Sequence, residues 1–266
     1  MTTRPAAVAG MFYPAPPAVL RQSVEQLLAA VGSTSGPQPK ALIVPHAGYI
    51  YSGSTAARAY ALLIPWAKAI RRVVLLGPTH RVAVNGLALP EATAFATPLG
   101  EVSIDAAAVA AIADLPQVVR SDVVHAQEHS LEVHLPFLQT VLADFELLPL
   151  AVGRASPEAV AEVLERLWGG PETLILISSD LSHFLPYANA QQIDASTCQR
   201  ILQLQNNIQP KEACGAFPVN GLLLAARHHG LRPQLLAACN SGDTAGDRQR
   251  VVGYAAFAFA EGSPMP

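Results

Sequence analysis

Three histidines, His46, His80 and His183, each lie shortly after a run of aliphatic residues typical of a buried strand. If the three strands are parallel neighbours in one sheet, the imidazoles share its carboxyl edge, where open α/β sheets bind ligands. Imidazole binds transition metals and exchanges protons near neutral pH. Taken alone, each histidine also fits a hydrogen-bonded turn residue. The agreement of the three positions predicts one metal or catalytic site.

Carboxylates accompany these histidines. Asp180 precedes His183 by three residues, so both side chains can face one site. Asp180 would then orient the imidazole, as carboxylates do for metal-bound or catalytic histidines, or it would serve as a helix N-cap. Glu128 and His129 stand before a helical stretch and could enter the same site.

The remaining polar residues give weaker signals. His125 and His134 flank Glu128 and His129, but their order does not match the H-E-x-x-H zinc motif, and a solvated helix face is the favoured interpretation. Serines near His183 suggest a hydrolase, yet no G-x-S-x-G elbow frames them. Cys214 could be a nucleophile at a helix start, although a small buried thiol is favoured.

Composition narrows the class of protein. Hydrophobic residues make up 51% of the 266 residues, charged residues 14%, and the net charge is −3, with no basic run suited to nucleic acid. No run of 18 apolar residues predicts a membrane span. The three cysteines form no C-x-x-C pair, which favours a reducing compartment. We therefore expect a cytoplasmic protein that binds neither membranes nor nucleic acid.

Strand and helix patterns alternate along the chain, which is typical of parallel βαβ units. The patterns predict strands at 41–45, 72–77, 84–89, 145–152, 173–178 and 251–260. They predict helices at 16–31, 54–63, 106–114, 129–143, 157–168, 189–206 and 219–229. We expect a single α/β domain over 1–266, with a central, mostly parallel sheet and helices on both faces.

Ordered sequence blocks along nearly the whole chain resemble the Memo family, known in bacteria and archaea as AmmeMemoRadiSam system protein B. The blocks are Arg4-Pro5, 8–14, 45–53, 77–80, 128–132, 178–183, Cys214-Gly215, 240–243 and 251–254. The family is similar in fold to LigB-type extradiol dioxygenases, which hold non-haem iron. The resemblance implies the same fold here and, by association, a radical SAM partner protein.

The resemblance also implies a set of site residues. His46 and His80 match two histidines of the pocket that corresponds to the dioxygenase iron site, and Asp180 and His183 match the aspartate and histidine of that pocket. The third ligand of the animal relatives, a cysteine, falls near Thr244, whereas Cys239 lies five residues too early. We expect the adjacent Asp243 to replace it, completing the two-histidine, one-carboxylate arrangement that binds iron(II).

Two functions follow as hypotheses. The first is a metal-dependent, dioxygenase-like oxidoreductase with iron(II), or else copper, on His46, His80 and Asp243. In it His183, oriented by Asp180, or else His129 would move protons, and Glu128 would be a further catalytic residue. The second is a non-catalytic binding or scaffold protein that keeps the pocket and recognises a small anion or a peptide. Metal content of the purified protein distinguishes them.

Overall fold

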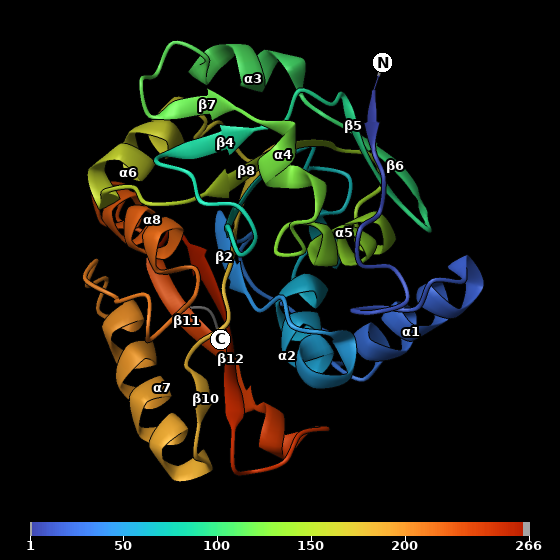
Figure 1. Cartoon of the computed structure of the whole chain (residues 1–266), viewed down its shortest axis with the longest axis vertical. Helices are drawn as coiled ribbons and strands as arrows, with labels where there is room; N and C mark the ends of the chain where they lie inside the picture. Colours follow the sequence, from blue (N-terminus) through green and yellow to red (C-terminus); the bar gives the residue numbers. More distant parts are fainter. Residues whose placement is uncertain (1, 263–266) are drawn as a thin grey trace.

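The structure is a computed structural model that describes residues 2–262, and its centre is a nine-stranded mixed sheet (Figure 1). Eight strands follow the order β10-β12-β2-β9-β3-β8-β4-β7, and β11 pairs with β12 outside this path. The strands of this sheet are β2 (Ala41–Val44), β3 (Arg72–Pro78), β4 (Leu87–Leu89), β7 (Val118–Arg120), β8 (Glu146–Val152), β9 (Thr173–Ser178), β10 (His183–Leu185), β11 (Arg232–Asn240) and β12 (Val251–Ala260).

Strands β2, β9, β3 and β8 are parallel neighbours and form the middle of the sheet. Each is a near-continuous buried aliphatic run, as expected for strands covered on both faces. The antiparallel strand β12 closes one side of this group and β4 the other. Because β2, β3 and β9 run in one direction, the segments after them meet at one edge, as the sequence predicted.

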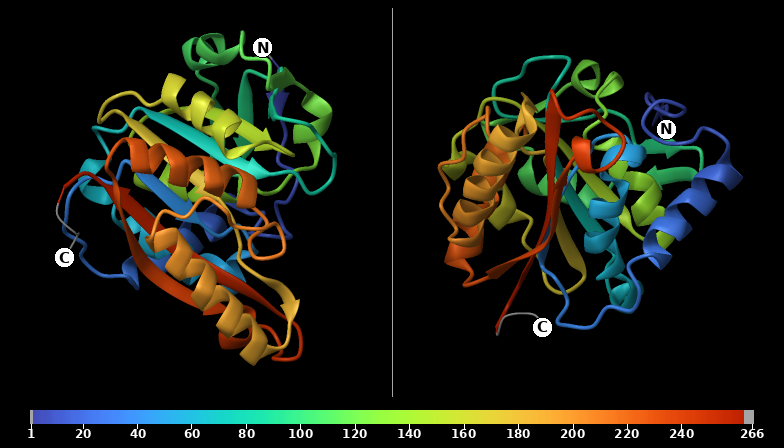
Figure 2. Two further views of the ribbon diagram at one scale, coloured as in Figure 1. Left: turned by 90° about the vertical axis from the view of Figure 1, so that its left-hand side faces the viewer. Right: turned by 90° about the horizontal axis from the view of Figure 1, so that it is seen from below.

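Helices cover both faces of the sheet (Figure 2). Val73 and Leu75 of β3 point into one apolar cluster, whereas Val74 and Leu76 point into the other, which follows from the alternation of side chains along a strand. The first face carries α1 (Pro17–Ala29), α2 (Tyr49–Ala61) and α5 (Leu135–Val141), and the second carries α3 (Ala106–Ile112), α6 (Pro157–Arg166), α7 (Tyr187–Leu202) and α8 (Ala216–His228). None of the helices in residues 2–262 has the length and apolar character to cross a membrane.

One predicted helix, at 129–143, is replaced by shorter elements. The chain instead forms the short helix α4 (Asp122–Ala126), a loop, the 3-10 helix η2 (Glu132–His134) and then α5. The reason is Pro136, which has no backbone N–H and whose ring clashes with the carbonyl four residues earlier, so that α5 begins with this proline in its first turn. The remaining 3-10 helices are η1 (Ile64–Trp66) and η3 (Ser241–Asp243).

The amino-terminal segment is tied to this loop by a buried ion pair. The Glu132 carboxylate accepts hydrogen bonds from Arg4, from the Tyr13 hydroxyl and from the N–H groups of Ala7 and Val8. A small sheet of β1 (Thr3–Arg4), β5 (Ala94–Thr97) and β6 (Gly100–Ser103) holds the other side of the segment. These contacts fix the loop that carries Glu128 and His129.

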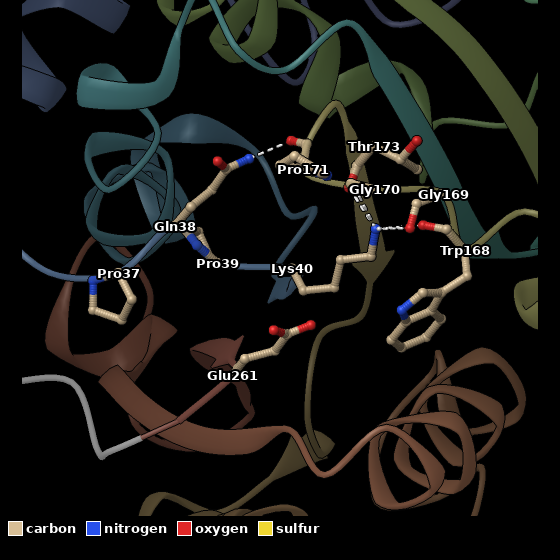
Figure 3. Close-up of a pocket in the computed structure, with 10 residues that line it drawn as sticks. All are labelled: Pro37, Gln38, Pro39, Lys40, Trp168, Gly169, Gly170, Pro171, Thr173 and Glu261. Atoms are coloured by element: carbon tan, nitrogen blue, oxygen red, sulfur yellow. Dashed lines mark hydrogen bonds between the residues drawn. The ribbon is translucent and has the colours of Figure 1, made fainter.

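A pocket at the amino end of the parallel strands is organised around Lys40 (Figure 3). The Lys40 ammonium donates to the carbonyls of Gly169 at 3.3 Å, Gly170 at 2.9 Å and Thr173 at 3.0 Å, and also to that of Trp168. Its Nζ lies 5.5 Å from the Trp168 ring centroid. This lysine therefore joins the turn before β9 to the start of β2.

Candidate metal centre

His46, His80 and His129 converge at the carboxyl edge of the sheet. One ring nitrogen from each lies within 4.8 Å of the others, which is close enough for one metal ion. The ring centroids are 5.2 Å apart for His46 and His80, 5.3 Å for His46 and His129, and 4.5 Å for His80 and His129. The structure thus brings the two predicted metal ligands together and adds His129, which the sequence suggested as a catalytic residue.

Glu128 orients His80. Its Oε1 lies 2.8 Å from His80 Nδ1, and its Oε2 accepts the His80 backbone N–H at 2.6 Å. Because the carboxylate accepts a hydrogen bond from Nδ1–H, the His80 Nε2 lone pair is left for a ligand. Burial alone would raise the pKa of Glu128, but hydrogen bonds and charge from His80 lower it to about 2. Glu128 is therefore a positioning carboxylate.

A chain of hydroxyl and carbonyl groups orients His46. The Ser178 hydroxyl donates to the Ser130 carbonyl at 2.7 Å, so at 2.6 Å from His46 Nδ1 it accepts the Nδ1 proton. His46 Nε2 is then unprotonated, as a metal ligand must be. A Cβ at Gly77 would lie 2.8 Å from the Ser130 hydroxyl oxygen, so glycine is required there for this chain to form.

Burial keeps the imidazoles of His46 and His129 neutral. It lowers the pKa of His46 far below the ordinary value and the pKa of His129 to about 4, and neighbouring histidines lower both further. The His129 ring also packs against Phe12, with centroids 4.6 Å apart. Neutral imidazoles are the form that binds metal, so no proton has to be displaced near pH 7.

Asp180 lies buried beside His46. Its Oδ1 accepts the His46 backbone N–H at 2.8 Å, and its Oδ2 is 4.0 Å from His46 Nε2. Burial raises the pKa of Asp180 to about 7, although hydrogen bonds from His46 and Ala47 oppose this. The carboxyl group can therefore hold or release a proton near neutral pH.

His183 stands at the start of β10 and lines the same pocket. Its Nδ1 lies 2.8 Å from the Leu181 carbonyl, which fixes the proton on Nδ1 and leaves Nε2 as an acceptor. The expected partner, Asp180, binds the His46 backbone instead. Burial lowers the pKa of His183. The pocket thus contains a fourth imidazole, outside the three-histidine group.

Cys214 is the residue that the sequence did not select. Its Sγ lies 3.5 Å from His46 Nε2 and accepts the Asp180 backbone N–H at 3.3 Å. Sulfur and nitrogen ligands of one tetrahedral metal are about 3.5 Å apart, given bond lengths near 2.3 and 2.05 Å. The available signal was Gly215, where a Cβ would lie 2.5 Å from the Ser178 carbonyl oxygen, so that the backbones approach closely.

The structure does not bring Asp243 to the three-histidine group. Its carboxylate accepts the Tyr187 hydroxyl and, at 3.0 Å, the Asn240 backbone N–H, as part of the capping box of η3. Thr244 donates to the Ser241 carbonyl at 3.3 Å, and Cys239 contacts Thr55 at 3.1 Å. Asp243 therefore serves as a helix cap in this structure.

His125 and His134 are buried rather than solvated, each with 1% of its surface exposed, so the expectation of a solvated helix face was wrong. His125 Nε2 donates to the Ala88 carbonyl at 2.8 Å, and His134 Nδ1 lies 2.6 Å from the Tyr60 hydroxyl. His125, in α4, packs against the Phe95 ring, and His134, in η2, packs against the Tyr60 ring, so both imidazoles are core groups.

A cavity of about 500 Å³, here called the first pocket, opens onto the imidazoles. The aromatic side chains of Phe12, Tyr51 and Tyr254 line it, and Arg250 contributes a positive charge. Asp180 and His183 also line it. An apolar wall with a few polar groups beside a metal-binding cluster suits a small molecule.

Comparison with known proteins places this site in context. A relative in Sulfolobus acidocaldarius, described as MEMO1 family protein, is 32% identical over 96% of this chain and 98% of the relative. A second relative with the same description, in Aquifex aeolicus, is 36% identical over 97% of this chain and 100% of the relative. The crystal structure of the uncharacterized protein JW3007 from Escherichia coli K12 has a TM-score of 0.50 and 12% identity, covering 83% of this chain and 99% of that one, which shows likeness of fold alone.

The match to the family described as Memo-like protein covers residues 4–258, which span the anchored amino-terminal segment, the three histidines and β12. A match over that much of the chain, together with near full-length relatives above 30% identity, leaves one conclusion. The chain belongs to the Memo-like protein family.

Proposed function

We propose that this protein is a metal-dependent, dioxygenase-like oxidoreductase that acts on a small molecule in the first pocket. The observation that carries the proposal is the convergence of His46, His80 and His129, with donor atoms within 4.8 Å. The hydrogen bonds at Nδ1 of His46 and His80 support it, because they leave both Nε2 atoms as acceptors. The resemblance to LigB-type dioxygenases supports the oxidative chemistry.

The donor set fits a borderline transition metal. Three imidazoles suit iron(II), copper and zinc alike, and we propose iron(II), as in the resembling dioxygenases. His46, His80 and His129 would hold it. The Cys214 thiol beside His46 favours copper(I) as the competitor, since sulfur is a soft ligand. When bound, the metal would supply Lewis-acid and one-electron chemistry that the side chains lack.

The chain's own residues would bind the substrate and move protons. Phe12, Tyr51 and Tyr254 line the pocket with apolar surface that limits access of water. His183, whose Nε2 is an acceptor, would take a proton from a substrate hydroxyl. Asp180 would hold or return a proton beside His46. A radical SAM protein remains a proposed partner, through the family association alone.

A second candidate is a binding protein that recognises a small anion. Arg250 is exposed at the first pocket, and no ion pair of its guanidinium occurs within residues 2–262. A carboxylate or phosphate could bind there without any metal chemistry. The two candidates therefore share one pocket and differ in what the three histidines do.

The experiment begins with metal analysis of protein purified without a histidine tag, followed by anaerobic titration with iron(II) and copper(I). We expect about one metal ion per chain, and loss of binding in His80→Ala. His228→Ala is the matched control, because His228 is an exposed histidine paired with Glu165 far along the chain. Wild-type affinity in His80→Ala would exclude this centre.

Oxygen uptake by the iron-loaded protein, with catechol as a chelating test substrate, separates the two candidates. Uptake above that of free iron, and its loss in His183→Ala, supports the oxidoreductase. A protein that binds iron and catechol but consumes no oxygen fits the binding protein instead.

A further inference from the structure

A second pocket adjoins the histidine cluster. This cavity of about 590 Å³, here called the second pocket, shares His80, His183 and Phe184 with the first pocket. Cys214, whose Sγ lies 3.5 Å from His46 Nε2, lines only the second pocket of the two. One of the proposed metal ligands, His80, is therefore bordered by two cavities, whereas a site for a compact substrate needs one.

The wall of the second pocket has an apolar part and two charged residues, Lys211 and Glu212. Leu185 from β10, Ile193 from α7 and Pro210 line it, and Ile193 is 37% exposed. The acidic residue at its rim, Glu212, is paired with Arg200 at 2.8 Å, so its charge is already neutralised. The apolar part of this wall suits an alkyl or aryl group.

Phe184 separates the two pockets in a strained conformation. Its φ of 59° lies in the left-handed region, which a bulky aromatic residue rarely adopts. The pairing of β10 with β12 is irregular between His183 and Leu185, which is where the strain is accommodated. The side chain is 61% exposed, and Arg250 Cζ lies 5.1 Å from its ring centroid.

Core packing does not explain this strain, because so exposed a ring buries little apolar surface. Strained residues of this kind cluster at ligand sites. The ring also lines both cavities and follows directly after His183. In this position the Phe184 ring can direct part of a ligand into one cavity or the other.

We propose that the second pocket binds an apolar arm of the substrate, while the polar end of the same substrate lies at the histidine cluster. Phe184 would then be a residue that determines specificity. The inference rests on the proposed metal site and adds the chemical class of the substrate, a metal-chelating head that carries an alkyl or aryl chain. The continuity of the second pocket with His80 and His183 argues for one extended ligand.

Hydroxamates with and without a chain test this on the cobalt(II)-loaded protein. Acetohydroxamate supplies the chelating head alone, and octanohydroxamate adds an apolar arm. We expect octanohydroxamate to bind about 30-fold more tightly, because burial of each methylene adds affinity. Dissociation constants come from titration of the cobalt absorption bands.

Ile193→Trp fills the second pocket without touching the proposed metal ligands, and it should remove most of the 30-fold gain while leaving acetohydroxamate binding unchanged. Val252→Phe is the matched control, since it enlarges a side chain that lines only the first pocket of the two. Octanohydroxamate affinity that survives Ile193→Trp but falls in Val252→Phe would place the arm in the first pocket and overturn the inference. Equal affinity of both hydroxamates would also overturn it.

The metal titration keeps the two proposals apart. A protein that binds no cobalt fails the proposed function, and the inference falls with it. A protein that binds cobalt and acetohydroxamate normally, but shows no effect of Ile193→Trp on the longer ligand, refutes the second pocket alone.

Discussion

The two ends of the parallel strands carry pockets of opposite character. At the amino end, the Lys40 ammonium is surrounded by backbone carbonyls that accept its protons. At the carboxyl end, His46 and His80 have their Nδ1 atoms engaged and their Nε2 atoms directed to a shared centre. The first arrangement leaves nothing for a ligand to satisfy, whereas the second leaves lone pairs.

Burial acts on both ends, with different consequences. It lowers the pKa of Lys40 to about 8, so the ammonium still predominates at neutral pH, and its carbonyl partners need that charge. It lowers the pKa of His129 to about 4, so the imidazole is neutral and able to bind metal. A buried titratable group marks a functional site only when the form that burial favours still has a free donor or acceptor atom.

The largest expected effect concerns metal affinity. His46→Ala should weaken iron(II) or cobalt(II) binding by more than about 100-fold, because a ligand is lost where second-shell changes already cost 10- to 100-fold. Lys40→Met should leave the affinity unchanged. Anaerobic titration of both variants provides the measurement, and an equal loss in the two would erase the distinction between the pockets.

The free energy of unfolding should depend more on the Lys40 pocket than on the histidine cluster. Lys40→Met keeps the aliphatic stem but leaves several partly buried carbonyls without a donor, so we expect a loss of about 2 kcal/mol in the free energy of unfolding. The metal-free His80→Ala variant should lose less, since the His80 side chain is 28% exposed. Urea denaturation of the metal-free proteins measures both. A Lys40→Met protein as stable as wild type would contradict the structural role of that pocket.

The pH dependence of the free energy of unfolding tests the buried imidazole of His134. Burial lowers the pKa of His134 to about 3, while the unfolded chain has an ordinary value near 6.5. Between these two pKa values the unfolded state binds more protons than the folded state, so the free energy of unfolding rises with pH. As the pH falls below 6.5, this stability is lost by up to about 1.4 kcal/mol per pH unit. His134→Gln should show a shallower slope between pH 4.5 and 6.5 in urea denaturation, and His228→Gln should keep the wild-type slope.

The smallest effect separates strain at the site from strain elsewhere. Phe184 and Leu204 both have positive φ, 59° and 54°, but Leu204 follows α7 away from the first and second pockets. Glycine at either position should relieve about 1 kcal/mol of backbone strain, although at Leu204 it also removes apolar contacts with the core. Only Phe184→Gly should change the affinity for octanohydroxamate. A changed affinity for octanohydroxamate in both variants would show that backbone strain, and not the Phe184 ring, determines ligand binding.

The local sequence determined the framework. The aliphatic runs of β2, β3 and β9 are strong enough to specify buried parallel strands, and turns after them carry His46 and His80. Strand β11 was missed because its residues are mostly half-buried and paired on one side, so neither a continuous apolar run nor a clear alternation marks it. A strand at the edge of a sheet depends on its partner, which the local pattern does not contain.

Tertiary structure decided which polar groups complete the site. Asp243 stood beside the expected ligand position in sequence, yet it caps η3, while Cys214 reaches His46 across 168 residues of chain. His125 and His134 are core groups because their hydrogen-bond partners, Ala88 and Tyr60, come from distant segments that cover them. Sequence patterns encode hydrogen bonds and burial within a few residues of each other. Contacts between distant segments arise from how the strands order themselves in the sheet, and that order places the donor atoms around the histidines.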